Sequence, residues 1–429
     1  MLDIKFIREN KELIAMAAQK KHIDFDVDKL IAVDDMRRKI MAEVEKKRAE
    51  QNAASDAIAR AQSPEERTRR IADMQELKKQ LQKQEEELKP IIKEWQQRMV
   101  QVPNIPDISV PEGESDRDNK EVKTWGDKPH FSFTPKSHLE LMTALNIVDF
   151  ERGTKIAGFR GYVLKNDGAL LSFAIWQAAM DHFLANNDGG EFVPMIVPSL
   201  VKRENFIGTG YLPQSEEDLY VTQDGDFLAG TAEVATMGYH ADEILEAAAL
   251  PKKFLSFSPC FRREAGSHSK DVKGLIRVHE FFKLEQVVLC AASHEESVQW
   301  HEALNRTTET FIEKLGIPYR TVVNCGGDLG LGQVKKYDIE LWVPGEKTYR
   351  EISSASYFHD FQARRLNIRY RDAEGKLRYV HSLNSTAIPT PRILVSLVEN
   401  FQQADGSVAI PELLQKYMGG KKIIAPNLC

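Results

Sequence analysis

Hydrophobic residues between positions 30 and 102 recur at intervals of three and four, and the positions between them carry mostly charged or amide side chains. This spacing places the apolar residues on one narrow stripe of a helix. The stripe runs from Leu30 to Ala61, stops at "AQSPEER", and resumes from Ile71 to Val102. The pattern predicts two antiparallel helices, which at 1.5 Å per residue form an arm of roughly 50 Å.

The turn between these helices carries its own signals. Ser63 is a good helix N-cap, and Pro64 suits the first helical position. Pro90 falls inside the second helix, where we expect it to interrupt and bend that helix. Half of a helical bundle would show a similar stripe, but the narrow seam and polar surroundings favour a protruding, solvated hairpin over residues 30–100.

The chain changes character near residue 105. The segment "VPNIPDISVPEGESDRDN" is rich in proline and acidic residues. It predicts a linker over 106–125, between an N-terminal domain, 1–105, and a larger domain, 126–429. Beyond it, helices are expected over 168–186 and 296–316, and strands over 191–201, 254–264, 283–291, 317–325 and 337–345. Neither strict βαβ alternation nor a phosphate-binding glycine loop occurs, which predicts an α+β domain with a mainly antiparallel sheet.

Composition narrows the choice of partners and compartment. The formal net charge is −6 and the pI is about 6.1, so contact with nucleic acid requires a locally basic surface. The four cysteines lie far apart, so we expect neither a disulfide framework nor a zinc site. No apolar run approaches eighteen residues, and the N-terminus lacks the apolar region of a signal peptide. We therefore expect a cytoplasmic protein without membrane contact.

Residues 261–285, "FRREAGSHSKDVKGLIRVHEFFKLE", combine fixed charges of both signs. On a strand, Arg262 and Glu264 would project from one face, and Arg277 and Glu285 would meet them from a partner strand. Such a face is costly to bury without ligands. It is therefore either an exposed ladder of ion pairs or the wall of a cleft for a charged ligand.

Two further polar groups fall at positions that we expect to be strands, and they favour the cleft. They are "GTAEV", with Thr231 and Glu233, and "TYREISSASYFHDFQARR", with Glu351, Ser353 and Ser354. The order "TAEV", "FRRE", "GLIRVHEFFKLE", "YREISS", "DFQARR" and "HSLNSTAIPTPRILVSLVENFQ" closely resembles the seryl-tRNA synthetases of bacterial type, a class II aminoacyl-tRNA synthetase family. The resemblance runs from Met1 to about residue 424.

The resemblance implies both a fold and a reaction. The fold is a coiled-coil hairpin followed by an antiparallel catalytic sheet flanked by helices, in a homodimer with Pro198 near its interface. The reaction joins serine and ATP into seryl-adenylate and pyrophosphate, and then passes serine to the 3′ end of serine tRNA. The hairpin over 30–100 would grip the long variable arm of that tRNA. Selenocysteine tRNA stays open as a second substrate.

The ATP-binding residues follow from the matching motifs. Arg262 is expected at the α-phosphate and Arg392 at the γ-phosphate, because a guanidinium pairs two N–H donors with phosphate oxygens. Glu351 and Ser354 would bind the Mg²⁺ that accompanies ATP. The adenine would meet a carboxylate acceptor, an aliphatic contact and aromatic rings from Glu264, Val278, His279 and Phe281. The full ATP-binding set is Arg262, Arg263, Glu264, Val278, Phe281, Glu351, Ile352, Ser353, Ser354 and Arg392.

The serine-binding residues follow in the same way. Glu233 and Thr231 would bind the α-amino group, since a carboxylate is a charge-assisted acceptor. Glu285 and Thr386 would bind the hydroxyl, the group that distinguishes serine from alanine. The full serine-binding set is Thr231, Ala232, Glu233, Arg262, Glu285, Asn384 and Thr386.

The last motif departs from the pattern of many bacterial members. They carry "LNGSG" where this chain has "LNSTAIPTPR", residues 383–392. Thr386 replaces a serine, and the spacing from Asn384 to Arg392 is kept, so these residues remain assigned. Pro389 and Pro391 stiffen a segment that is usually richer in glycine.

Two other classes of protein would share part of this sequence pattern with a tRNA ligase. A paralogue that aminoacylates a carrier protein would lack the hairpin, which is long and complete here. An inactive RNA-binding or regulatory relative would have lost Arg262, Glu264 or Arg392, and all three are present. The sequence therefore favours the enzyme, while rates and tRNA identity elements stay open.

Overall fold

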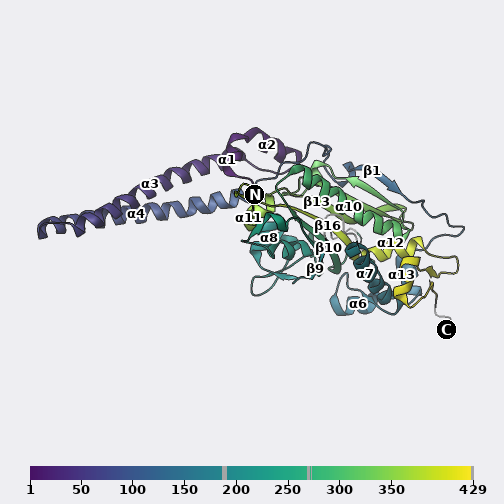
Figure 1. Cartoon of the computed structure of the whole chain (residues 1–429). Coiled ribbons are helices and arrows are strands. Elements are labelled where there is room, and N and C mark those ends of the chain that lie inside the picture. The colour runs from purple at the N-terminus through teal and green to yellow at the C-terminus, as the bar shows by residue number, and fades with distance from the viewer. Residues whose placement is uncertain (186–190, 268–270, 272, 427–429) are drawn as a thin grey trace. The chain divides into compact units, whose positions relative to one another are not determined.

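The structure is a computed structural model that describes residues 1–185, 191–267, 271 and 273–426. The chain divides into two compact units (Figure 1). The helical unit consists of residues 2–19 and 23–103, and the larger unit consists of Met1, 20–22 and 104–429. The division falls close to the predicted boundary at residue 105.

The hairpin predicted from the apolar stripe is confirmed. The helices of this region are α1 Ile4–Glu9, α2 Lys11–Lys20, α3 Val27–Ala59 and α4 Pro64–Met99. Helices α3 and α4 pack against each other and are joined by a short turn (Figure 1). The Ser63 hydroxyl accepts a hydrogen bond from the Glu66 backbone N–H at 3.1 Å, and Pro64 is the first residue of α4. The buried residues of the stripe include Leu30, Val33, Val44 and Leu81.

Pro90 does not interrupt the second helix. Helix α4 runs from Pro64 to Met99 with Pro90 inside it, so the predicted break was wrong. A proline removes one backbone N–H from the helical ladder, but the turns on both sides keep their own hydrogen bonds. The packing of α4 along α3 holds the remaining turns in helical geometry.

The larger unit is built on a sheet with eight strands among the described residues. Their order is β1, β11, β12, β13, β16, β10, β9 and β4. In that order they span Lys120–Trp125, Tyr319–Val323, Lys335–Val343, Thr348–Tyr357, His381–Thr390, Glu280–Cys290, Lys252–Phe261 and Val193–Ile196. All neighbours are antiparallel except β4 and β9, which are parallel. The predicted α+β class with a mainly antiparallel sheet is confirmed.

Strand β1 corrects the predicted linker over 106–125. Its residues 120–125 pair with β11, with Lys120 opposite Val323 and Trp125 opposite Tyr319. Four of the six side chains of β1 are exposed and three are charged, as is usual for a strand at the edge of a sheet. The same polarity made this strand resemble the acidic segment before it.

Three long helices pack on the sheet and close the main core. They are α7 Asp167–Ala185, α10 His294–Leu315 and α12 Arg392–Asn400. Helix α10 begins after the N-cap Ser293 and ends before Gly316, whose left-handed backbone favours glycine. Their apolar side chains join those of the central strands, including Ile175, Leu284, Phe311, Ile388 and Leu397. This core fixes the strands that carry the polar residues of the site.

The remaining elements are short. The helices are α5 His138–Ala144, α6 Phe150–Ala157, α8 Arg203–Thr209, α9 Ala232–Gly238, α11 Phe361–Leu366 and α13 Glu412–Gln415. The paired strands are β2 Val148–Asp149, β3 Val163–Leu164, β5 Leu200–Val201, β6 Tyr220–Val221, β7 Phe227–Leu228, β8 Ile244–Glu246, β14 Arg369–Arg371, β15 Leu377–Tyr379, β17 Val408–Ala409 and β18 Ile423–Ile424. Among the helices of the described residues, none combines the length and the apolar character that a bilayer crossing requires.

Two polar groups that we expected on strands lie elsewhere. Strand β9 ends at Phe261, so Arg262 and Glu264 belong to the following loop and share no strand face. The φ of Glu264 is +54°, a left-handed conformation that cannot continue a strand. Thr231 is the N-cap of α9, where its hydroxyl accepts from the Glu233 backbone N–H at 3.2 Å.

Candidate active site

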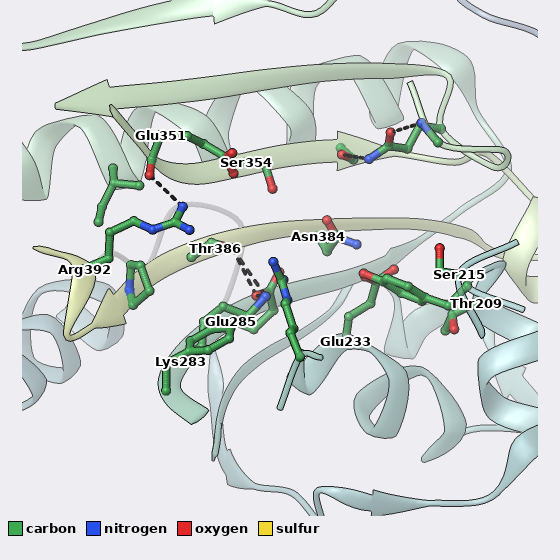
Figure 2. Close-up of a pocket in the computed structure, with 18 of the residues that line it drawn as sticks. Thr209, Ser215, Glu233, Lys283, Glu285, Glu351, Ser354, Asn384, Thr386 and Arg392 are labelled. Atoms are coloured by element: carbon green, nitrogen blue, oxygen red, sulfur yellow. Dashed lines mark hydrogen bonds and ion pairs between the residues drawn. The ribbon is translucent and has the colours of Figure 1, made fainter. Parts of the chain in front are cut away.

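A cleft of about 280 Å³ opens over the central strands β10, β13 and β16 (Figure 2). It brings together side chains that are far apart in the sequence, from α9, the loop after β9, and the three strands. The predicted site residues that line it are Glu233, Arg262, Glu264, Val278, Phe281, Glu285, Glu351, Ile352, Ser354, Asn384, Thr386 and Arg392. The charged stretch is therefore the wall of a cleft, and the alternative of an exposed ladder of ion pairs was wrong.

Five predicted residues are not among those that line the cleft, and Thr231 is one of them: its buried hydroxyl accepts from Lys283 Nζ at 2.6 Å. Ser353 donates to a backbone carbonyl of β16, and Arg263 donates to a neighbouring backbone carbonyl at 3.1 Å. Ala232 is buried within α9, and His279 lines a separate apolar hollow. Strand alternation explains Ser353, because Ile352 and Ser354 line the cleft and leave the intervening side chain on the opposite face.

Glu233 is almost fully buried, with 4% of its surface exposed. The Tyr211 hydroxyl donates to its Oε2 at 2.9 Å, and Gln362 Nε2 donates to its Oε1 at 2.7 Å. Burial raises the pKa of Glu233 to about 7, although the hydrogen bonds from Gln362 and Tyr211 act in the opposite direction. Its carboxyl therefore changes charge near neutral pH. Sequence reasoning missed Tyr211, which lies in no motif, and Gln362, which lies in "DFQARR".

Lys283 is a further site residue that the motifs did not assign. Its Nζ donates to Thr231 Oγ1 at 2.6 Å and forms an ion pair with Glu285, both side chains being buried. Thr386 Oγ1 donates to Glu285 Oε2 at 3.3 Å. Since Lys283 and Glu285 are two positions apart on β10, strand alternation places both on the cleft side. That spacing was a usable signal in the sequence.

Arg392 lies at the other end of the cleft from Thr209 and Ser215 (Figure 2). Its Nε donates to the Ile276 carbonyl at 2.9 Å, and its Nη1 donates to the Glu351 carbonyl at 2.9 Å. Burial lowers the pKa of the Arg392 guanidinium, and the nearby Glu351 acts in the opposite direction. Two bonds to backbone thus fix the direction of this guanidinium beside the carboxylate of β13.

Arg262 is held by backbone and by an aromatic ring. Its Nε and Nη2 donate to the Gly230 carbonyl at 3.3 and 3.2 Å, and its guanidinium carbon lies 5.2 Å from the Phe281 ring centroid. Arg277 forms an ion pair with Glu264 at 2.9 Å. We expected Arg277 and Glu285 to share a face of the sheet, and this prediction was wrong. Arg277 lies before β10 and pairs with the loop that follows β9.

The antiparallel sheet and the cleft on its central strands define a class II aminoacyl-tRNA synthetase. Residues 221–401 match the family model described as "tRNA synthetase class II core domain (G, H, P, S and T)". Residues 1–106 match the "Seryl-tRNA synthetase N-terminal domain". The chain belongs to the seryl-tRNA synthetase family.

Full-length relatives agree with this membership. The chain is 44% identical to the serine–tRNA ligase of Deinococcus radiodurans, over 99% of each sequence. It is 42% identical to that of Nitratidesulfovibrio vulgaris, over 98% of each. It is similar in structure to seryl-tRNA synthetase from Pyrococcus horikoshii complexed with ATP, at a TM-score of 0.89 and 38% identity, covering 99% of this chain and 100% of that one.

Proposed function

We propose that the cleft performs serine ligation with ATP at the Arg392 end and serine beside Glu233 and Glu285. The activity itself follows from the family: the chain is an ATP-dependent serine–tRNA ligase. One observation carries the assignment of the site. Two guanidiniums, from Arg262 and Arg392, and two buried carboxylates converge on one cleft from separate segments of the chain.

In the first step, a serine carboxylate oxygen attacks the α-phosphorus of ATP, and the bond to the bridging oxygen of pyrophosphate breaks. Negative charge grows on the α-phosphate, where Arg262 stabilises it. Arg392 binds the γ-phosphate and aligns pyrophosphate as the leaving group. The loop carboxylate of Glu264 accepts from the adenine amino group, and Phe281 stacks on the base. The serine carboxylate is already ionised, so this step needs no general base.

Glu351 and Ser354 fit a magnesium ion that arrives with ATP. They offer a carboxylate and a hydroxyl, the oxygen ligands that a hard cation prefers. The described residues contain no group of three or more His, Cys, Asp or Glu side chains able to hold a metal. The phosphates of ATP would therefore complete the coordination. When bound, the ion neutralises phosphate charge, and Glu351 and Ser354 set its position.

Serine selection rests on the buried pair of β10. Glu285 accepts a hydrogen bond from the serine hydroxyl, and Thr386 contributes a second polar contact. Alanine would leave these groups unsatisfied, and such a defect discriminates by about 10⁴ or more in sites of this kind. Glu233, with Thr231 at the start of α9, accepts from the serine ammonium group. Asn384 lines the cleft between these groups and supports the pocket.

The helical unit supplies the contact to tRNA. Basic residues cluster in the outer half of the hairpin, and Arg48 and Arg70 are paired with Glu85 and Glu66 there. The other basic residues of this half are Lys46, Lys47, Arg60, Arg67, Arg69, Lys78, Lys79 and Lys83. Such a surface neutralises phosphates of the long variable arm and reads its shape more than its sequence. This contact is not needed for seryl-adenylate formation.

A homodimer explains an apolar surface of the larger unit. Leu170 and Phe173 on α7 and Val193 and Ile196 on β4 are exposed, Ile196 by 87%. Exposed apolar side chains in such number usually mark an interface. Pro198, the residue predicted near the interface, lies two positions after β4 and is exposed.

The assignment is tested by two assays on the full chain. Serine-dependent exchange of pyrophosphate into ATP should occur without tRNA, and charging should require serine tRNA. Exchange that proceeds equally well with alanine or threonine would refute the serine site. Charging of selenocysteine tRNA in the same assay would decide whether it is a second substrate.

A further inference from the structure

The cleft has a third part, beyond the residues assigned to ATP and serine. In Figure 2, Thr209 and Ser215 lie at the end away from Arg392 and Glu351, with Glu233 between them. None of the residues at this end, which we call the outer end, was assigned to ATP or serine. Its lining residues are Thr209, Gly210, Gln214, Ser215, Gly330, Leu331, Gly332 and Gln333.

Two loops meet at the outer end. A Cβ atom on Gly210 would lie 3.3 Å from the Phe361 ring, and one on Gly332 would lie 2.7 Å from the same ring. Phe361 therefore lies between the loop of residues 209–215 and the loop of residues 330–333. The absence of a side chain at Gly332 lets the second loop approach the ring closely.

Loop 330–333 is held from behind by Lys21. The Lys21 Nζ donates to the carbonyls of Gly330, Leu331 and Gln333 at 3.1, 2.9 and 2.6 Å. The Asn104 side-chain amide donates to the remaining carbonyl of the loop, that of Gly332, at 3.0 Å. All four carbonyls are thus engaged by groups that do not line the cleft.

The burial of Lys21 is costly, so its contacts must be specific. Only 3% of this residue is exposed, and burial lowers the pKa of its side chain. Three carbonyl acceptors need three N–H donors, which only the ammonium form has. A buried ammonium is tolerated when such bonds replace its hydration. An apolar residue would fill the same space but would not orient the loop.

The loop in turn orients a side chain toward the catalytic strands. Gln333 Oε1 accepts from the Gly330 backbone N–H at 2.6 Å, and its Nε2 donates to Ser356 Oγ on β13 at 2.8 Å. A chain of hydrogen bonds therefore connects Lys21, through loop 330–333, to Ser356 on β13.

We propose that Lys21 is a positioning residue for the transfer step: it holds the wall of the outer end, the side of the cleft from which the 3′-terminal nucleoside of tRNA reaches seryl-adenylate. This inference rests on the proposed function. After activation, the AMP group fills the Arg392 end and serine fills the middle, so the attacking ribose must enter from the side that remains free. The side chains of Gln214 and Ser215 offer an amide and a hydroxyl suited to a nucleoside.

The chemistry of transfer balances at this position. A ribose hydroxyl oxygen of the terminal nucleoside bonds to the seryl carbonyl carbon. The bond between that carbon and the AMP phosphate oxygen breaks, and the hydroxyl proton leaves with the AMP phosphate. The residues of the outer end align the hydroxyl and take no part in forming seryl-adenylate.

The test separates transfer from activation in the full-length enzyme. Seryl-adenylate is formed on the enzyme first, serine tRNA is added at saturation, and transfer is followed in a single turnover. Lys21→Met removes the ammonium, and Ser215→Tyr fills the outer end from the opposite loop. Each should slow transfer by about tenfold or more, because a poorly aligned attacking group loses the advantage of proximity. Serine-dependent pyrophosphate exchange should change by less than about threefold.

Lys20→Met is the matched control, because Lys20 is the neighbouring lysine but pairs with Glu112 at 3.0 Å. It should leave both rates as in the wild type. Wild-type transfer rates in the Ser215→Tyr variant, or an equal loss of exchange and transfer in both variants, would overturn the inference. Ser215 is partly exposed, so its variant serves even if Lys21→Met fails to fold. A wild-type chain without serine-dependent exchange would instead refute the proposed function.

Discussion

Lys283 and Glu285 form a buried ion pair on one face of β10, directly beside the hydroxyl of Thr386. Removing one member of such a pair leaves the other charge buried and unpaired, which costs more than the pair itself is worth. The pair places a carboxylate oxygen where we propose that the serine hydroxyl binds. We therefore include Lys283 in the proposed amino-acid pocket.

Glu285→Ala should reduce serine activation far more than alanine activation. The wild-type carboxylate accepts from the serine hydroxyl, whereas alanine has no group to donate, so the preference should fall by about 10²-fold or more. Pyrophosphate exchange with each amino acid measures the ratio. An equal loss with both amino acids would assign Glu285 to structure alone, and the thermal stability of the variant provides the control.

Arg262→Ala should lower the rate of activation by about 10²–10³-fold and leave serine binding nearly unchanged, because its charge acts mainly in the transition state. Arg262→Lys should recover little, since an ammonium cannot reproduce the planar fork of donors. Pre-steady-state adenylate formation gives the rate, and serine titration gives the binding. Normal exchange in the alanine variant would remove Arg262 from the mechanism.

Serine affinity should depend on pH through Glu233. Its pKa of about 7 means that the ionised fraction rises from about one tenth at pH 6 to about nine tenths at pH 8. Because the serine ammonium needs an ionised acceptor, KM for serine should fall about tenfold over this range. The Glu233→Gln variant should bind serine weakly and without this dependence. A flat profile in the wild type would contradict the role given to Glu233.

Replacing residues 30–100 with a short Gly/Ser link should separate serine activation from the charging of tRNA. Pyrophosphate exchange should stay close to wild type, while charging of serine tRNA should fall by orders of magnitude because the phosphate contacts are lost. The affinity of the full chain for tRNA should also weaken steeply with salt. Efficient charging by the shortened protein would show that the hairpin is not needed for tRNA and serves another contact.

The apolar surface around α7 and β4 should control the oligomeric state. Phe173→Asp combined with Ile196→Asp should yield a monomer in analytical ultracentrifugation, because two charges would be buried at the interface. Ile108 is 99% exposed on a different segment, so Ile108→Asp is a matched control and should leave the assembly intact. A wild-type chain that sediments as a monomer would refute the proposed dimer.

The sequence predicted elements with a clear period better than those without one. The hairpin and the cap at Ser63 follow from a long apolar stripe and a known capping pattern. Strand β1 was missed because its exposed edge looks like a linker. Arg262 and Glu264 were misplaced because the strand ends at Phe261, and side-chain alternation gives no sign of where a strand ends.

The site was predicted as far as its motifs extended. Most motif residues line the cleft, but Lys283, Tyr211 and Gln362 were not assigned any role. Lys283 could have been assigned from strand alternation, because it lies two positions before Glu285 on β10. Tyr211 meets Glu233 only through the folded arrangement of distant segments, so local sequence gave no signal for that contact.

Strand β16 lies between β10 and β13, where Thr386 pairs with Glu285 and Ser385 pairs with Ala355. It is synthesised about a hundred residues after β10, and loop closure over that distance is slow. Until residues 381–390 leave the ribosome, the two flanking strands have no neighbour on their facing edges and invite wrong pairing. A nascent chain that stops before residue 381 lacks Asn384, Thr386 and Arg392, three of the residues that line the cleft. The cleft is therefore complete only late in translation, when the last central strand inserts and Arg392 follows it.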